Sequence, residues 1–188
     1  MKIVFLDTET TGIPSSLNIN TDDQVRIVQM GWIITDNSTI THTRTFIIKP
    51  EGYTITNDFV HGITTEKATK EGQSIDKIIK LFLEDIQGVD QIVCHNVTFD
   101  MYMLVFEVRK LGINTDYLTS IPTFCTMRSS SIKGVRYQRL KDLYFSFFNE
   151  TPAILHEAME DTYSCLRCYF YMQHKIDMAD EIAKSKSK

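Results

Sequence analysis

The chain has 188 residues, a length that fits one domain with a substantial buried core. Hydrophobic residues make up 43% of it and charged residues 23%, which excludes the profile of an intrinsically disordered protein. The net charge of −4 excludes binding to a polyanion by bulk positive charge, although it leaves room for a local contact. We expect residues 1–180 to form a single domain. Residues 181–188 are expected to form a flexible tail, because the last five residues, 184–188, are all polar.

Neither a membrane segment nor a secretory signal is visible in the sequence. No apolar run approaches the ~18 residues of a membrane-spanning helix, and Asp7 interrupts the first apolar run too early for a signal peptide. The four cysteines are irregularly spaced, which favours reduced, packing side chains, although Cys165 and Cys168 have the spacing of half a zinc or redox motif. We therefore expect a cytoplasmic protein without membrane contact.

The hydrophobic patterns predict an α/β fold built on a mixed five-stranded sheet. A turn signal at residues 36–38 separates two β-rich segments that follow the opening strand, so the first three strands are expected to form an antiparallel meander. The later strands alternate with helices and are expected to be parallel. The predicted strands cover residues 3–9, 25–35, 40–48, 91–94 and 122–125, and the predicted helices cover residues 75–86, 98–110, 140–148 and 157–174.

Two carboxylates end the first apolar run, in the segment Asp7-Thr8-Glu9-Thr10-Thr11-Gly12. Side chains alternate between the faces of a strand, so Asp7 and Glu9 point the same way, roughly 6.6 Å apart along the backbone. Two neighbouring acids repel each other and lose hydration unless a cation compensates, and a hard divalent cation is the simplest compensation. The alternative is a strand that ends in a solvated acidic loop.

Two later segments place further acids at element boundaries. Residues 92–100 end a buried strand and begin a helix, and Asp100 lies in the first turn of that helix. The helix dipole alone favours an acid there, but ligands of such sheets also gather at strand ends. Near the C-terminus, His156 and Asp161 are five residues apart, ~140° around an ideal helix. They can meet only if His156 lies at or before the helix start, which Pro152 favours. Alone, each would be a solvated surface residue.

Together, the three segments (D-x-E-T-T-G, H-N-x-x-F-D and H-x-x-x-x-D) resemble the exonuclease motifs of the DEDD superfamily. The closest branch is the DnaQ-like one with a histidine in its third motif, DEDDh. That branch includes the proofreading subunit of the bacterial replicative polymerase (DNA polymerase III epsilon), RNase T and oligoribonuclease-type enzymes. Residues 26–31 and 60–64 also resemble the second strand and the H-G-I-T segment of the family. The resemblance covers about residues 2–174 and implies a ribonuclease H-like fold.

The resemblance implies that four acids surround two divalent cations, Mg²⁺ or Mn²⁺, and that His156 is the general base. Chemistry agrees, because hard oxygen ligands suit Mg²⁺ or Mn²⁺ better than zinc, and a neutral imidazole can accept a proton from water. By analogy, Asp7 bridges the ions, Glu9 and Asp161 complete the site that orients the water, and Asp100 holds the second ion.

The resemblance further implies a 3′–5′ exonuclease that hydrolyses phosphodiester bonds at 3′ ends of single-stranded nucleic acid, with DNA favoured, and releases nucleoside 5′-monophosphates. The alternatives are an RNA-selective exoribonuclease and a non-catalytic module that binds nucleic-acid ends. A DNA polymerase and a second copy of the chain are the candidate protein partners. Phe99 has core packing, and His61 a surface loop position, as an equal alternative to substrate contact. The predicted substrate contacts are Thr10, Thr11, Gly12, Ile13, His61, Asn96 and Phe99.

Overall fold

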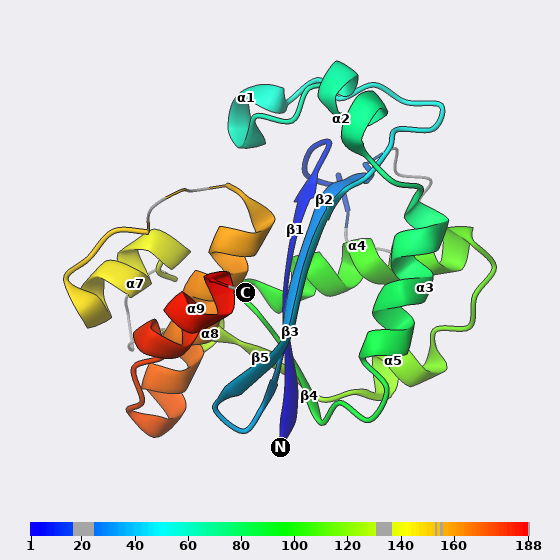
Figure 1. The fold of residues 1–188 in the computed structure, drawn as a ribbon. Coiled ribbons are helices and arrows are strands. Elements are labelled where there is room, and N and C mark those ends of the chain that lie inside the picture. The colour runs from blue at the N-terminus through cyan, green and yellow to red at the C-terminus, as the bar shows by residue number, and fades with distance from the viewer. Residues whose placement is uncertain (17–24, 131–136, 153, 155, 188) are drawn as a thin grey trace.

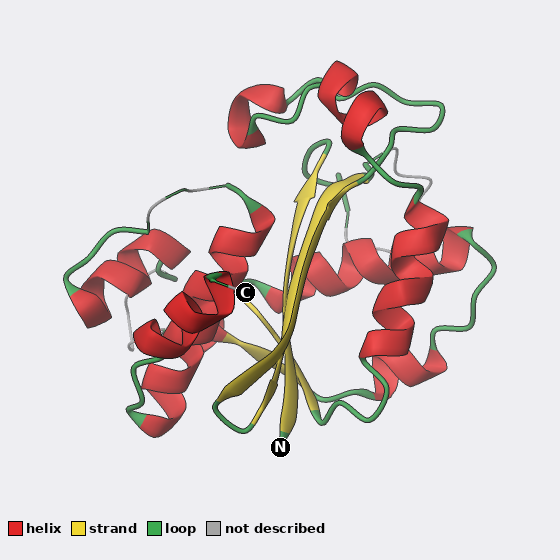
Figure 2. Cartoon of the chain, in the orientation of Figure 1, coloured by secondary structure: helices red, strands yellow, loops and turns green. Residues whose placement is uncertain are grey.

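A five-stranded sheet forms the centre of the computed structural model, which describes residues 1–16, 25–130, 137–152, 154 and 156–187 (Figure 1, Figure 2). The strands lie in the order β3-β2-β1-β4-β5. Strands β1, β2 and β3 pair antiparallel, whereas β4 pairs parallel with both β1 and β5. The predicted meander and the predicted parallel strands are therefore confirmed. The strands are β1 (Lys2–Thr10), β2 (Ile27–Asp36), β3 (Thr39–Ile47), β4 (Gln91–Cys94) and β5 (Thr123–Cys125).

Helices cover both faces of the sheet (Figure 1). Helices α3 (Ile75–Asp85), α4 (Val97–Lys110) and α5 (Asp116–Ser120) lie on one face. Helices α7 (Leu140–Phe148), α8 (Ala158–His174) and α9 (Ala179–Lys186) lie on the other, while α1 (Asp58–His61) and α2 (Thr65–Glu71) lie beyond the end of β1. The short helix α6 (Thr126–Ser129) directly follows β5. None of the helices in the described part of the chain combines the length and apolar character needed to cross a bilayer.

Strand β1 supplies side chains to a separate hydrophobic core on each face. Val4 and Leu6 belong to the core beneath α3 and α4, whereas Ile3 and Phe5 belong to the core beneath α8 and α9. This alternation follows from the two-residue period of a strand. It also means that the odd-numbered residues that follow Phe5 face the side of the sheet on which α8 lies.

The first turn of α8 lies against the backbone of β2 at Gly31. A Cβ atom on Gly31 would come within 2.9 Å of the carbonyl carbon of Ala158, closer than side-chain packing permits. Thr162, one turn later, donates a hydrogen bond from Oγ1 to the Gly31 carbonyl oxygen at 3.3 Å. The absence of a side chain at Gly31 therefore fixes where α8 begins relative to the sheet.

The C-terminal segment differs from the expected tail. Residues 179–186 form helix α9, and residue 188 lies outside the described residues. Ile182 packs against the core beneath α8, Glu181 Oε1 accepts a hydrogen bond from the Ile40 amide at 3.0 Å, and Lys186 Nζ lies 2.5 Å from Glu160 Oε1. These contacts correct the expectation of a flexible tail from residue 181, because they hold helix α9 against the core, β3 and α8.

Candidate active site

The two carboxylates of the first motif lie at the end of β1. Asp7 is paired with Gly31 and Glu9 with Gln29 in the register of β1 and β2. Both point to the face that carries α8, as the strand period predicts. Glu9 is buried, and Asp7 is partly exposed at the surface of a cavity.

Asp161 and His156 approach these carboxylates from the start of α8. Glu157 is the N-cap residue of this helix, so His156 lies before the helix, where the sequence places it. His156 has a positive φ of 58°, and its backbone amide donates a hydrogen bond to Asp161 Oδ2 at 3.2 Å. Ligand atoms of Glu9, His156 and Asp161 lie within 4.8 Å of one another. The backbone reversal before α8 therefore brings the histidine and the acid of the third motif to Glu9.

Asp100 reaches the same site from the first turn of α4. Its side chain is 2% exposed, and its Oδ1 accepts hydrogen bonds from the backbone amide of Thr8 at 3.0 Å and from Thr8 Oγ1 at 2.9 Å. Thr8 lies between Asp7 and Glu9 and points to the opposite face of β1, toward α4. Strand β1 therefore carries Asp7 and Glu9 on one face. On its other face, Thr8 holds Asp100 through two hydrogen bonds.

Burial raises the pKa values of the acids at this site, and mutual repulsion adds to its effect. Loss of hydration is the largest cause in each case. The pKa is raised to about 8 for Glu9, to about 7 for Asp100 and to about 6 for Asp161. Burial also raises the pKa of Asp7 well above its ordinary value, and the charges of Asp100, Asp161 and Glu9 raise it further. Hydrogen bonds from Thr8 oppose the rise at Asp100. The four acids therefore lie within electrostatic reach of one another.

Two residues that sequence reasoning missed, Gln29 and Glu157, hold the start of α8 against the sheet. The buried Gln29 side chain accepts a hydrogen bond from the Ala158 amide at 3.1 Å and donates one to Glu157 Oε1 at 2.8 Å. Glu157 Oε2 in turn accepts from the Glu160 amide at 2.9 Å. For Gln29, the sequence feature that could have indicated a role was a polar amide within an otherwise apolar strand pattern. For Glu157, no sequence feature distinguished it from the neighbouring His156.

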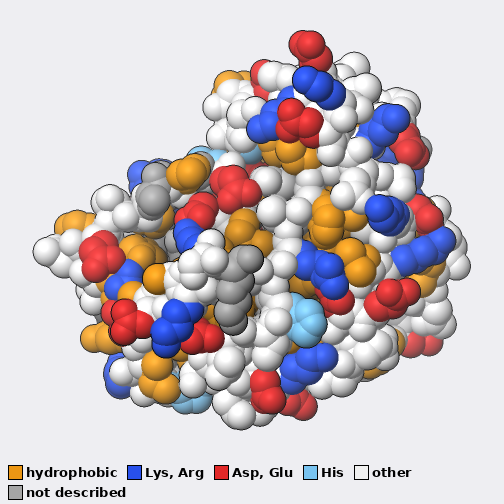
Figure 3. All heavy atoms as spheres, viewed as in Figure 1, with side chains coloured by type: hydrophobic (Ala, Val, Ile, Leu, Met, Phe, Trp, Pro, Cys, Tyr) orange, Lys and Arg blue, Asp and Glu red, His pale blue; other side chains and the backbone are white. Residues whose placement is uncertain are grey.

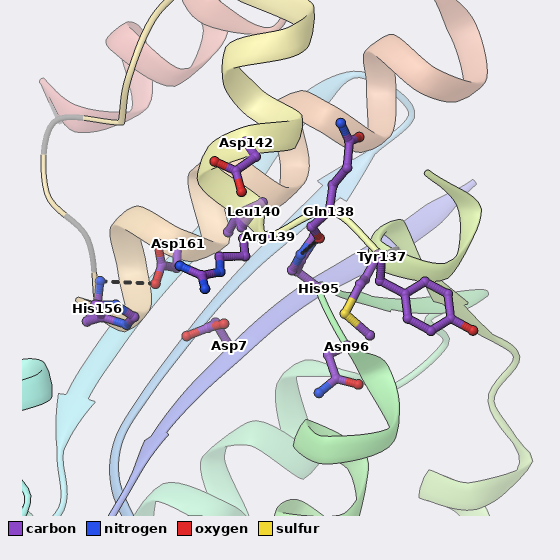
Figure 4. Close-up of a pocket in the computed structure, with 11 residues that line it drawn as sticks. Asp7, His95, Asn96, Tyr137, Gln138, Arg139, Leu140, Asp142, His156 and Asp161 are labelled. Carbon is purple, nitrogen blue, oxygen red and sulfur yellow. Dashed lines mark hydrogen bonds between the residues drawn. The ribbon is translucent and has the colours of Figure 1, made fainter. Parts of the chain in front are cut away.

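A cavity of about 690 Å³ opens above this acidic cluster (Figure 4). Asp7, His156 and Asp161 form one side of it, and Asn96 and His95 contribute from the end of β4. Its remaining wall comes from Met127, from residues 137–140 and from Asp142 in the first turn of α7, none of which sequence reasoning assigned to the site. The face of the molecule drawn in Figure 3 intersperses acidic and basic side chains and shows no extended basic surface.

Comparison with known proteins assigns the family. The model of the family described as "Exonuclease" matches residues 4–169, which is most of the chain. The chain belongs to this exonuclease family. The resemblance to DEDDh exonucleases is thereby confirmed, and this exonuclease is a hydrolytic enzyme of that class. No curated protein sequence matched the chain.

Solved structures of exonuclease I from E. coli share the fold. The complex with a dA16 oligonucleotide matches with a TM-score of 0.68 and 18% identity, over 93% of this chain and 41% of that chain. The complex with a dT13 oligonucleotide matches with a TM-score of 0.71 and 18% identity, over 97% of this chain and 43% of that chain. The ribonuclease H-like fold is confirmed, and this exonuclease spans about two fifths of the exonuclease I chain.

The predicted substrate contacts are distributed around the site rather than gathered in the cavity. Of the predicted substrate contacts, Asn96 is the one found among the described residues that line the cavity. It lies at the start of α4 and has a positive φ of 79°. Ile13 is 86% exposed beyond the end of β1, whereas Phe99 is half-buried and packs against the core beneath α3 and α4. The assignment of these residues to substrate stays a prediction.

The segment after β1 is fixed by local hydrogen bonds. Thr10 Oγ1 donates to the Gly12 carbonyl oxygen at 2.6 Å, and Thr11 Oγ1 accepts from the Arg26 amide at 2.9 Å. His61 is half-buried at the end of α1, and its Nδ1 accepts a hydrogen bond from the Ile63 amide at 3.1 Å. Burial lowers the pKa of His61, so the imidazole is biased toward its neutral form.

Proposed function

We propose that this exonuclease removes nucleotides from the 3′ end of single-stranded nucleic acid, with DNA favoured, and releases nucleoside 5′-monophosphates. The observation that carries the proposal is the convergence of acids from three separate elements, β1, α4 and α8, beside one open cavity. The burial that makes these acids costly to ionise is the arrangement expected where a cationic ligand supplies the missing compensation.

The donor set fits two divalent metal ions. Among the described residues, Asp7, Glu9, Asp100 and Asp161 form no ion pair with lysine or arginine, so no protein cation competes with a metal ion for their carboxylate oxygens. Carboxylate oxygens are hard ligands and suit Mg²⁺ or Mn²⁺. When bound, two such ions stabilise the attacking and leaving oxygens of an in-line phosphoryl displacement. Asp7, Glu9, Asp100 and Asp161 are the residues that would hold them.

His156 supplies the group that takes up a proton from the attacking water. It is exposed at the edge of the cavity, and one of its ring nitrogens lies within 4.8 Å of a carboxylate oxygen of both Glu9 and Asp161. Its backbone amide is held by Asp161. An imidazole in its neutral form has a free nitrogen lone pair that can accept this proton. Asp161 thus has two roles, because it contributes to the acidic cluster and also fixes the backbone that carries the general base.

The preference for DNA is drawn from the family resemblance and from the fold. The E. coli exonuclease I structures that share this fold contain the DNA oligonucleotides dA16 and dT13. A choice between DNA and RNA depends on how the protein approaches the 2′ position of the sugar. An RNA-selective exoribonuclease is therefore the alternative that the first experiment must distinguish. A DNA polymerase or a second copy of the chain remains the proposed kind of protein partner.

The test is a degradation assay on matched DNA and RNA strands of one sequence, labelled at the 5′ end and incubated with Mn²⁺ or with chelator. We expect a ladder that shortens from the 3′ side with Mn²⁺, no ladder with chelator, and faster loss of DNA. Chromatography of the products should show nucleoside 5′-monophosphates. Faster loss of RNA would favour the exoribonuclease, and binding without any shortening would favour a non-catalytic module.

A further inference from the structure

One basic side chain enters the acidic cavity. Among the described residues that line the 690 Å³ cavity, Arg139 is the one lysine or arginine. Figure 4 shows its guanidinium directed toward the carboxylates of Asp7 and Asp161. Arg139 also lines a smaller adjoining cavity of about 280 Å³ together with His156 and Asp161. No sequence pattern points to Arg139, because it lies outside all three motifs.

The guanidinium of Arg139 is available for a ligand. In the described part of the chain it makes no ion pair and no hydrogen bond, although carboxylates surround the cavity that it lines. Two other arginines behave differently: Arg26 Nε lies 2.8 Å from Glu107 Oε1, and Arg167 Nε lies 2.6 Å from Asp177 Oδ1. Arg139 therefore offers the donors of a planar guanidinium, a group that matches the oxygens of a phosphate.

The backbone on both sides of this side chain is anchored. The Gln138 carbonyl oxygen accepts a hydrogen bond from His95 Nε2 at 3.1 Å, which places the proton on Nε2 and leaves Nδ1 to accept from Thr126 Oγ1 at 2.9 Å. The Arg139 carbonyl oxygen accepts from the amides of residues 142 and 143, both at 3.0 Å, at the start of α7. The direction in which Arg139 leaves the backbone is therefore set by the end of β4 and by α7.

Charge balance favours a phosphate as the ligand. When ionised, the four acids of the cluster and the neighbouring Glu157 carry more negative charge than two divalent cations would neutralise, and a phosphodiester adds another negative charge that grows during displacement. We propose that Arg139 contacts the scissile phosphate of the bound strand and stabilises the charge that develops on its non-bridging oxygens. This inference rests on the proposed function. The residue would thus be a catalytic residue contributed by the segment before α7.

The experiment compares Arg139→Gln with Arg109→Gln, which removes the same charge from the last turn of α4, at the opposite end of that helix from Asp100. Turnover is measured on a single-stranded DNA oligonucleotide with Mn²⁺. Loss of a charge-assisted hydrogen bond to the reacting phosphate should lower kcat about 10- to 100-fold in Arg139→Gln and leave it unchanged in Arg109→Gln. Arg139→Lys should retain an intermediate rate. Added guanidinium should restore part of the rate of Arg139→Ala without accelerating the wild type.

Binding supplies a readout that does not depend on turnover. Anisotropy of a fluorescent DNA 12-mer in Ca²⁺, with the strand checked for integrity, gives the slope of log Kd against log salt. Removal of one phosphate contact should reduce the magnitude of that slope by about 0.7 in Arg139→Gln alone. Equal rates and equal slopes for both variants would overturn the inference while the proposed function stands. A wild type that binds but does not shorten the strand refutes the proposed function, and the slopes then still decide the phosphate contact. A wild type that neither binds nor cleaves refutes both.

Discussion

Helix α4 carries two buried acids that have opposite surroundings. Asp100 and Glu107 lie seven residues apart, on one face of the helix, and are 2% and 1% exposed. Glu107 receives Arg26 in a two-pronged ion pair, with Nε to Oε1 and Nη2 to Oε2 both at 2.8 Å. Asp100 receives two neutral donors from Thr8 and, among the described residues, no cation. One acid joins α4 to the start of β2, and the other faces three more acids.

The comparison separates a structural acid from a site acid by compensation rather than by burial. A buried carboxylate loses hydration, and the cost is offset only if opposite charge and hydrogen bonds replace the water. Arg26 supplies that compensation for Glu107. At Asp100 the cost persists, and it appears as a pKa raised to about 7. A fold retains such a group at a stability cost, so an uncompensated cluster beside an open cavity indicates a cationic ligand.

The largest expected effect is the loss of activity in Asp7→Ala. This change removes an acid from the centre of the cluster without removing core volume, so hydrolysis should fall to the level of a chelated control. The melting temperature in chelator should be equal to or above that of wild type, because repulsion among the acids is relieved. Asp142→Ala is the matched control, since Asp142 is exposed and lines the same cavity from α7. Residual turnover near the wild-type rate in Asp7→Ala would remove it from the site.

A matched pair on α4 tests the comparison directly. Asp100→Asn should abolish most activity with Mn²⁺ and raise the stability of the metal-free protein, since the amide needs no compensating charge. Glu107→Gln should keep the activity and lower the free energy of unfolding by about 1–3 kcal/mol, because Arg26 loses its charged partner. Chemical denaturation gives the free energy of unfolding of each variant, and the nuclease assay gives its activity. If Glu107→Gln is the inactive variant, the division between site acid and structural acid is wrong.

The next effect concerns the base rather than the acids. His156→Ala should lower turnover at neutral pH by roughly 10²–10⁴-fold, the range for a lost general base, and should change the pH dependence of kcat. His42→Ala serves as the control, because His42 is exposed on the edge strand β3, where it pairs with Ile34. An unchanged rate and pH profile in His156→Ala would assign proton transfer to another group.

The smallest expected effect is a pH dependence of stability. The raised pKa of Asp100 means that the folded, metal-free protein keeps a proton that the unfolded chain releases near pH 4. The resulting stability is fully present below about pH 4 and is lost as the pH rises through about 7. Relative to Asp100→Asn, the wild type in chelator should therefore lose at most about 1.4 kcal/mol per pH unit over this window. Added Mn²⁺ binds the ionised acids, so it should raise the melting temperature more at pH 8 than at pH 6. A difference between the two proteins that does not vary with pH would contradict the raised pKa of Asp100.

Local signals in the sequence were sufficient for the strands, the long helices and the motif acids. The strand period put Asp7 and Glu9 on one face, and the five-residue spacing required His156 to precede α8; the structure has both arrangements. The expected tail was the main error in the elements, because docking of α9 depends on the packing of Ile182, on a hydrogen bond to Glu181 and on one ion pair between Lys186 and the distant Glu160. No local pattern reports such contacts.

The sequence by itself determined which acids and which histidine the site contains, because strand and helix periods fix side-chain direction within each element. Only the tertiary structure decided what surrounds them. The anchoring of α8 by Gln29, the close approach at Gly31 and the entry of Arg139 join residues more than a hundred positions apart or outside any motif. Compensation of a buried charge is a property of such long-range contacts. It could therefore separate Asp100 from Glu107 only after the chain had folded.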